Sequence, residues 1–121
     1  MSSHIPESDW RHFKRLHGEL LERYCARVLD ELSASLKAGD GTAYDRYVLA
    51  YQLLKSRDKE LARAFDDFRR STAVMQLTIM RRMGLLSDED LSVFSAQTQE
   101  QVRGITSIVG GDMARDAMGS P

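Results

Sequence analysis

The sequence predicts an all-α fold, with a long antiparallel helical hairpin followed by one or two short C-terminal helices. Prolines occur only at Pro6 and Pro121, so positions 7–120 contain no residue that must break a helix. Apolar residues also recur with a helical period over two long stretches. For a chain of 121 residues, we expect a single helical domain over 1–109 and a flexible C-terminal tail over 110–121.

The first helix is predicted from Trp10 to about Lys37, where apolar residues recur at helical spacing. Ser8 is its expected N-cap, because a serine hydroxyl can accept a hydrogen bond from the free N–H groups of the first turn. Adjacent apolar pairs such as Leu20 and Leu21 make its apolar face wider than one neighbouring helix can fill. Gly39 is expected to end this helix in the left-handed conformation.

A second helix is predicted to begin after Thr42, its expected N-cap, and to continue to Gly84. Its seam residues alternate at spacings of three and four for five heptads, as in a coiled coil or a long bundle helix. The seam positions are Tyr44, Tyr47, Tyr51, Leu54, Asp58, Leu61, Phe65, Phe68, Thr72, Met75 and Ile79. The short connection at 38–41 predicts antiparallel packing, with residue i of the first helix near residue 79 − i of the second.

The C-terminal part of the chain is predicted to add short helices. Ser87 is followed three residues later by Asp90, a capping-box pattern that favours a helix to about Phe94. We expect a turn and a new cap at 95–98, and then a last helix that continues to Val109.

The predicted helix lengths indicate that the fold needs a further partner. The second helix would be about 62 Å long and the first about 42 Å, so the end of the second helix has nothing to pack against. Either the C-terminal segment or a second copy of the chain must cover it. We expect a homodimer, because two-fold association is the commonest arrangement.

Composition excludes several classes of protein. Cys25 is the only cysteine, which argues against a secreted fold held by intramolecular disulfides. The N-terminus lacks the basic and apolar regions of a signal peptide, and no apolar run approaches the roughly 20 residues that span a bilayer. We therefore expect a cytoplasmic protein that is not a membrane protein.

The motifs of common enzyme classes are missing from the sequence. It contains no glycine-rich phosphate loop and no nucleophile elbow. Cys25 lies on an apolar helix face, as a small core residue would. The Glu-x-x-His elements that metal sites in helical bundles use do not occur. The sequence therefore predicts a non-enzymatic protein that binds no metal or cofactor.

Asp58 is a polar residue on the predicted seam. The predicted pairing brings it near His17 and Tyr24, so these three side chains could form a partly buried polar cluster. A single polar seam residue is more often a device that sets the register of the helices. A bundle enzyme or phosphotransfer protein centred on His17 and Asp58 is the more distant alternative.

Two candidate interaction surfaces lie toward the end of the predicted second helix. The first is apolar and rich in methionine, which suits a surface that adapts to a protein partner. It consists of Met75, Ile79, Met83, Leu85 and Leu86. The second is basic and could contact phosphates or an acidic partner. It consists of Arg63, Arg69, Arg70, Arg81 and Arg82.

Charge is unevenly distributed along the chain. Residues 53–83 carry eight Lys/Arg and four Asp/Glu, whereas residues 84–121 carry two and six. Neutralisation of one segment by the other competes with binding of nucleic acid, and the pI of about 6.3 is low for a nucleic-acid-binding domain. The sequence predicts a small interaction or regulatory module that presents a helical surface to a protein partner. A nucleic-acid-associated regulator that uses the basic face is the alternative.

Overall fold

The computed structural model describes residues 5–104, and in this range the chain forms helices joined by turns. The all-α class predicted from the sequence is confirmed. The elements are α1 (Glu7–Ala38), α2 (Ala43–Phe65), the 3-10 helix η1 (Arg70–Thr72), α3 (Ala73–Arg82) and α4 (Asp88–Ser92). A further helical segment spans residues 96–104.

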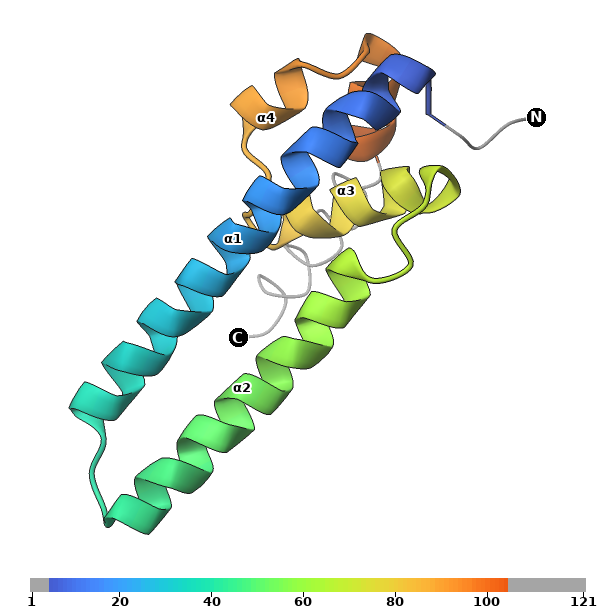
Figure 1. Ribbon diagram of the computed structural model, residues 1–121. Coiled ribbons are helices and arrows are strands. Elements are labelled where there is room, and N and C mark those ends of the chain that lie inside the picture. Colours follow the sequence, from blue (N-terminus) through green and yellow to red (C-terminus); the bar gives the residue numbers. More distant parts are fainter. Residues whose placement is uncertain (1–4, 105–121) are drawn as a thin grey trace, which may run out of the picture.

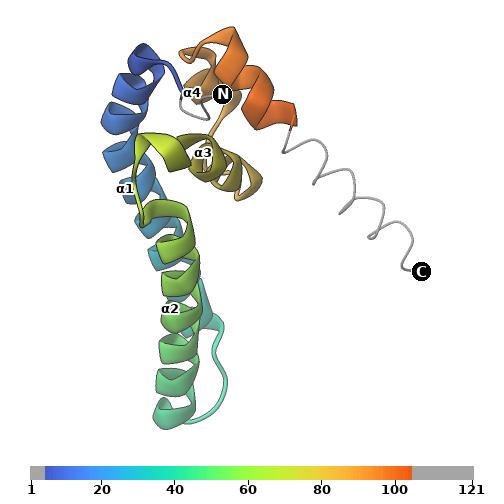
Figure 2. The same cartoon turned by 90° about the vertical axis from the view of Figure 1, so that its right-hand side faces the viewer.

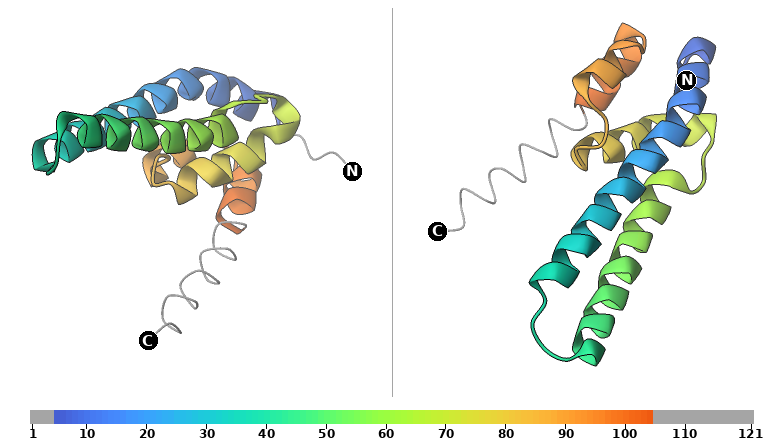
Figure 3. Two further views of the ribbon diagram at one scale, coloured as in Figure 1. Left: turned by 90° about the horizontal axis from the view of Figure 1, so that it is seen from below. Right: turned by 60° about the vertical axis from the view of Figure 1, so that its left-hand side comes forward.

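The fold has two parts that differ in burial. α1 and α2 lie side by side and run in opposite directions, while α3, α4 and the 96–104 segment gather around the N-terminal half of α1 (Figures 1 and 2). All buried residues of the described chain lie in 5–28 and 64–104, which we call the head. Residues 29–63, which we call the arm, extend away from the head as a pair of helices with no buried residue (Figure 3).

α1 begins earlier than the sequence predicts, and Ser8 is not its N-cap. The helix starts at Glu7, and the carbonyl of Pro6 accepts a hydrogen bond of 3.0 Å from the Trp10 N–H. The φ of Pro6 is −56°, within the narrow range that its ring imposes and suited to a helix start. Ser8 is therefore already inside the first turn.

The connection between α1 and α2 is capped as predicted but turns at a different glycine. Thr42 and Asp45 form a reciprocal capping box, which confirms Thr42 as the N-cap of α2. Gly39 has a φ of −67°, so the expected left-handed cap is wrong at that position. Gly41 takes the positive φ of 97° instead, and a Cβ atom there would lie 2.8 Å from Asp45 Oδ2.

The predicted continuous helix from Thr42 to Gly84 is also wrong, because α2 ends at Phe65. Asp67 takes a φ of 55° and the chain reverses into η1. The Thr72 hydroxyl donates to the Asp67 carbonyl at 2.7 Å and accepts from the Arg69 N–H at 3.1 Å. The Gln76 amide also donates to the Asp66 carbonyl. These side-chain hydrogen bonds give the turn backbone the partners that it would otherwise find in a helix.

Aromatic packing favours the same break in α2. Phe68, just after α2, stacks on the His17 ring at a centroid distance of 3.8 Å. It also lies 4.9 Å from the Trp10 ring and 5.2 Å from the Phe13 ring. The turn therefore places Phe68 against α1, where it gains contacts with three rings. The 3.6-residue period of the sequence carries no signal of this turn.

The later helices end and begin as the sequence predicts. Gly84 follows α3 with a φ of 72°, the left-handed conformation that favours glycine. Ser87 and Asp90 form the predicted capping box at the start of α4. Arg27 donates to the Met83 and Gly84 carbonyls at 2.6 and 3.0 Å, and so binds the end of α3 to α1.

The hydrophobic core lies entirely in the head. Its largest fully buried apolar side chains come from α1, α3, α4 and the segments that flank them. They are Ile5, Phe13, Leu20, Leu77, Met80, Leu85, Leu91 and Val102. The predicted end of the last helix at Val109 and the predicted tail over 110–121 lie outside the described residues.

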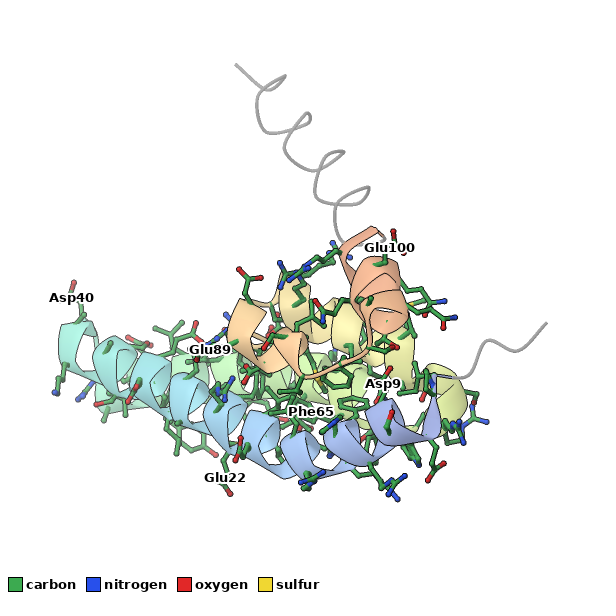
Figure 4. The ribbon with its side chains drawn as sticks, turned by 90° about the horizontal axis from the view of Figure 1, so that it is seen from above. Asp9, Glu22, Asp40, Phe65, Glu89 and Glu100 are labelled. Carbon is green, nitrogen blue, oxygen red and sulfur yellow. The ribbon has the colours of Figure 1, made fainter. Side chains whose placement is uncertain are left out.

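A buried carboxylate joins the first helix to the last. Asp9 exposes 1% of its surface and accepts hydrogen bonds from the Ser95 N–H at 2.8 Å and the Ser95 hydroxyl at 2.6 Å. The Thr98 hydroxyl donates to the same side chain at 2.6 Å. Asp9 therefore satisfies the polar groups where the 96–104 helix begins, and Figure 4 shows it beneath that helix.

We predict that Asp9→Ala lowers the free energy of unfolding by about 2 to 3 kcal/mol, because it leaves buried donors on Ser95 and Thr98 without an acceptor. Urea denaturation followed by circular dichroism would measure the loss. Asp58→Ala is the matched control, because Asp58 is an exposed helical aspartate and its loss should change stability by less than about 0.5 kcal/mol. Equal stability of the two variants would contradict the role given to Asp9.

Candidate interaction surface

The arm exposes a row of large apolar side chains on each of its two helices. Tyr44 exposes 73% of its surface, Tyr47 69% and Leu29 60%, whereas Leu20 in the head is fully buried. We call six of these exposed residues the arm face. They are Leu29 and Leu36 of α1 and Tyr44, Tyr47, Tyr51 and Leu54 of α2.

Several polar contacts join the two helices, and none of them uses the side chains of these rows. Arg57 of α2 donates to both carboxylate oxygens of Glu31 at 2.9 Å. Arg46 Nη2 donates to the Leu36 carbonyl at 2.9 Å near the end of the arm. Where the arm joins the head, the Tyr24 hydroxyl contacts the Arg57 carbonyl at 2.8 Å and Glu60 Oε1 at 2.9 Å. These hydrogen bonds therefore join α1 to α2 through side chains outside the two apolar rows.

Helix geometry places both rows on the same side of the arm. Each row lies further round its helix, in the direction of increasing residue number, than the side chains that face the other helix, by roughly 140° on α1 and roughly 110° on α2. On α1 the row is offset from Tyr24 and Glu31, and on α2 from Arg46 and Arg57. Because α1 and α2 run in opposite directions, offsets in the same rotational sense turn both rows toward one side. The leucines of α1 and the tyrosines of α2 therefore face the same side of the arm.

The arm face lies on the side away from α3 and α4. Arg23 and Arg27 of α1 point the other way, since they bind the Leu85, Met83 and Gly84 carbonyls at the end of α3. In Figure 4, α4 and the 96–104 segment lie above α1, and Glu22 points down on the opposite side. No part of the head therefore packs over the arm face.

The tyrosine row follows the predicted heptad spacing, but it does not face the first helix as that pattern predicts. The heptad pattern identified Tyr44, Tyr47 and Tyr51 as seam residues that face the first helix. In the structure Phe65, in the same row, is buried in the head, whereas the tyrosines are exposed. The predicted pairing is also shifted, because Tyr24 bonds to Arg57 and Glu60 rather than lying opposite position 55.

The polar cluster predicted from His17, Tyr24 and Asp58 does not form. Asp58 is exposed on α2, and Glu60 and Arg57 occupy the position by Tyr24 that was expected for it. Burial of the Tyr24 hydroxyl, and then its hydrogen bond to Glu60, raise the pKa of this phenol.

A cleft of about 240 Å³ lies beside Tyr24, between α1, α2 and the end of α3. Its polar lining residues already bond to one another or to the backbone, as Arg57 does with Glu31 and Arg27 with Met83. The cleft is therefore a structural junction in which these groups hold one another in place.

His17 lies instead in an aromatic cluster in the head. Its ring stacks on Phe68, and the Phe65 and Phe13 rings lie 5.2 and 5.8 Å away. His17 Nε2 is buried without a hydrogen-bond partner among the described residues. Burial lowers the pKa of His17, and hydrogen bonding to the Phe65 backbone offsets only part of this effect. His17 is therefore a packing residue that favours its neutral form.

The five apolar residues predicted to bind a protein do not share one environment. Met75 exposes 58% of its surface, and Ile79 and Met83 are half-buried. Leu85 and Leu86 belong to the core, where α3 turns into α4. Because α3 is a separate short helix, this segment is part of the head. It does not continue α2 beyond the end of α1, as the sequence predicts.

The predicted basic residues are largely engaged with acidic groups of the same chain. Arg69 pairs with Asp67 at 2.7 Å, Arg70 with Glu7 at 2.9 Å and Arg81 with Asp88 at 2.8 Å. Arg70 also donates to the Ile5 carbonyl, so it fixes η1 to the start of α1. Arg63 and Arg82 are exposed on α2 and α3. The break after Phe65 separates Arg63 from the others, so the five do not lie along one helix.

Within residues 5–104, no three or more His, Cys, Asp or Glu side chains lie close enough together to hold a metal ion. In the same range, no helix combines the length and the apolar character needed to cross a bilayer. Comparison of the chain with models of protein families, with curated proteins and with solved structures gives no match.

We predict that the protein loses stability as the pH falls from 7.5 to 5.5, in part through His17. At pH 7.5 the imidazole is largely neutral in both states; as the pH falls through 6.5 the unfolded chain binds the proton first, because the folded-state pKa is lowered. The loss due to His17 should be about 1 kcal/mol at most, since the ring is only partly buried.

Urea denaturation of the wild type and His17→Gln at both pH values measures this contribution. The variant should be less stable at pH 7.5, and its deficit relative to the wild type should shrink at pH 5.5. A deficit that stays constant between the two pH values would show that His17 does not contribute to the pH dependence.

Proposed function

We propose that the protein is a non-enzymatic interaction module whose arm face docks on a helical surface of a protein partner. One observation carries the proposal. Six large apolar side chains from two helices are exposed on one side of the arm, and although the Lys55 ammonium lies 6.0 Å from the centre of the Tyr51 ring, no part of the head covers them. Monomeric proteins rarely leave contiguous apolar surface of this kind in contact with water.

The composition of the arm face supports a protein partner. Tyrosine is enriched in protein interfaces, because its ring supplies a large contact area with few rotatable bonds and its hydroxyl can remain at the wet rim. Tyr44, Tyr47 and Tyr51 lie one after another along α2, as anchor residues of an interface do. A surface built this way acts by binding and requires no catalytic group.

Nucleic acid is a poorer candidate for the partner. Arg69, Arg70 and Arg81 already pair with carboxylates at 2.7 to 2.9 Å, so a phosphate would have to displace an acidic group of the same chain. Lys55 lies over the Tyr51 ring, but the paired arginines Arg69, Arg70 and Arg81 lie in the head and form no basic track along the exposed rings of the arm. Single-strand binding surfaces combine exposed aromatic rings with such a track.

Site-specific photo-crosslinking tests the proposal. A benzophenone amino acid replaces Tyr51 in the arm face, and the tagged full-length protein is irradiated in cells and recovered under denaturing conditions. We expect discrete covalent protein adducts, because a docked partner lies within reach of position 51. Mass spectrometry then identifies the attached chain, whether it is a different protein or a second copy.

The same amino acid at position 49 is the matched control. Leu49 is exposed by 53% on the same helix, but it lies about half a turn away from the tyrosine row. Adducts should form at position 51 and not at position 49. If both positions gave the same weak, non-discrete products, the arm face would not be a docking surface.

A further inference from the structure

We infer that the arm face pairs with the arm face of a second copy of this chain. The inference rests on the proposed function and names the occupant of the same surface. The two arms would stack through their apolar sides into a four-helix layer, with the heads on the outside. Four-helix bundles commonly have such a two-on-two arrangement.

The apolar area suits an interface between two copies. A tyrosine side chain contributes roughly 150 to 250 Å² when buried, so the exposed fractions of Tyr44, Tyr47 and Tyr51 amount to about 400 Å² per chain. The leucines of the arm face add to this. A stable interface of standard size buries about 800 Å² per partner, so the three tyrosines alone supply about half of it.

The charge of the arm favours pairing with itself. Residues 29–63 contain six Lys/Arg and six Asp/Glu, which gives a formal net charge of zero. Two copies can therefore approach without net repulsion, as an isologous interface requires. A strongly acidic or strongly basic partner would find no complementary charge on the arm.

The width of the arm face favours a two-helix occupant over a single helix. Its leucine row and its tyrosine row lie on separate helices, and each row needs its own cover. A second arm presents two rows at the same spacing, so each row meets another. A lone helix in the groove between α1 and α2 would leave the outer edges of both rows in water.

Asp58 marks where this interface ends toward the head. It continues the tyrosine row past Leu54 and is exposed. Burying its carboxylate without a partner would be costly, so the contact covers the arm and stops before Asp58. The head then remains outside the interface, with its α3 surface and Met75 still accessible.

Size-exclusion chromatography with light scattering on the full-length protein, over a wide concentration range, tests the inference. We expect a mass of twice 13.7 kDa for the wild type and of 13.7 kDa for Tyr47→Asp. Because two-fold symmetry places the substitution at two sites, the dissociation constant should rise roughly a thousandfold. Leu49→Asp is the matched control and should remain a dimer.

Circular dichroism on each variant checks that the fold is retained. Hydrogen exchange then locates the contact between the two copies. On dilution of the wild type, amides of 29–54 should lose protection while those of α3 keep theirs. A wild-type monomer at every concentration would overturn the inference, as would a dimer that Leu49→Asp disrupts and Tyr47→Asp does not. A wild-type monomer that still gives discrete adducts with another protein at position 51 would leave the proposed function standing without the pairing.

Discussion

The arrangement of the whole chain depends on the turn that ends α2. Had the helix continued beyond Phe65, α3 would extend past the start of α1. Leu77 and Met80 of α3 would then not reach the core of the head. The turn exists because Thr72 and Gln76 supply hydrogen bonds to its backbone, and because Phe68 stacks on His17. Since α3 then folds back on one side of α1, the buried residues gather at one end of the α1–α2 pair. The other end is left as an arm without a core.

The sequence predicted several features that depend on neighbours along the chain, although not the start of α1 or the conformation of Gly39. The helical class, the Thr42 cap, the Ser87 capping box and the glycine after α3 all follow from local hydrogen bonding and backbone freedom. The break after Phe65 could not be predicted, because it depends on contacts of Phe68 and Gln76 that exist only in the folded chain. A heptad pattern that continues through a turn also gives no sign that the helix has ended.

The tyrosine row of the arm face shows a second limit of prediction from sequence. Periodicity places the tyrosines on one side of the helix, but the prediction that this side faces the first helix is wrong, since a period defines a side of a helix and not its neighbour. Hydrogen bonds between α1 and α2 involve Arg57 and Glu31, which are charged residues, and Tyr24, which the predicted pairing places near Asp58 instead. The buried role of Asp9 could not be predicted either, because an aspartate in the first turn of a helix is common and its partners Ser95 and Thr98 are far away in the sequence.

The contact between Asp9 and Thr98 has a consequence for the order of folding. The two residues are 89 positions apart, whereas Arg57 and Glu31 are 26 apart. Contacts between nearby residues close smaller loops and form earlier, so the paired helices of the arm can assemble while the head is still open. On the ribosome, Asp9 must wait until Thr98 has been synthesised and released from the exit tunnel. The apolar side of the arm is thus complete in a nascent chain well before the head can close.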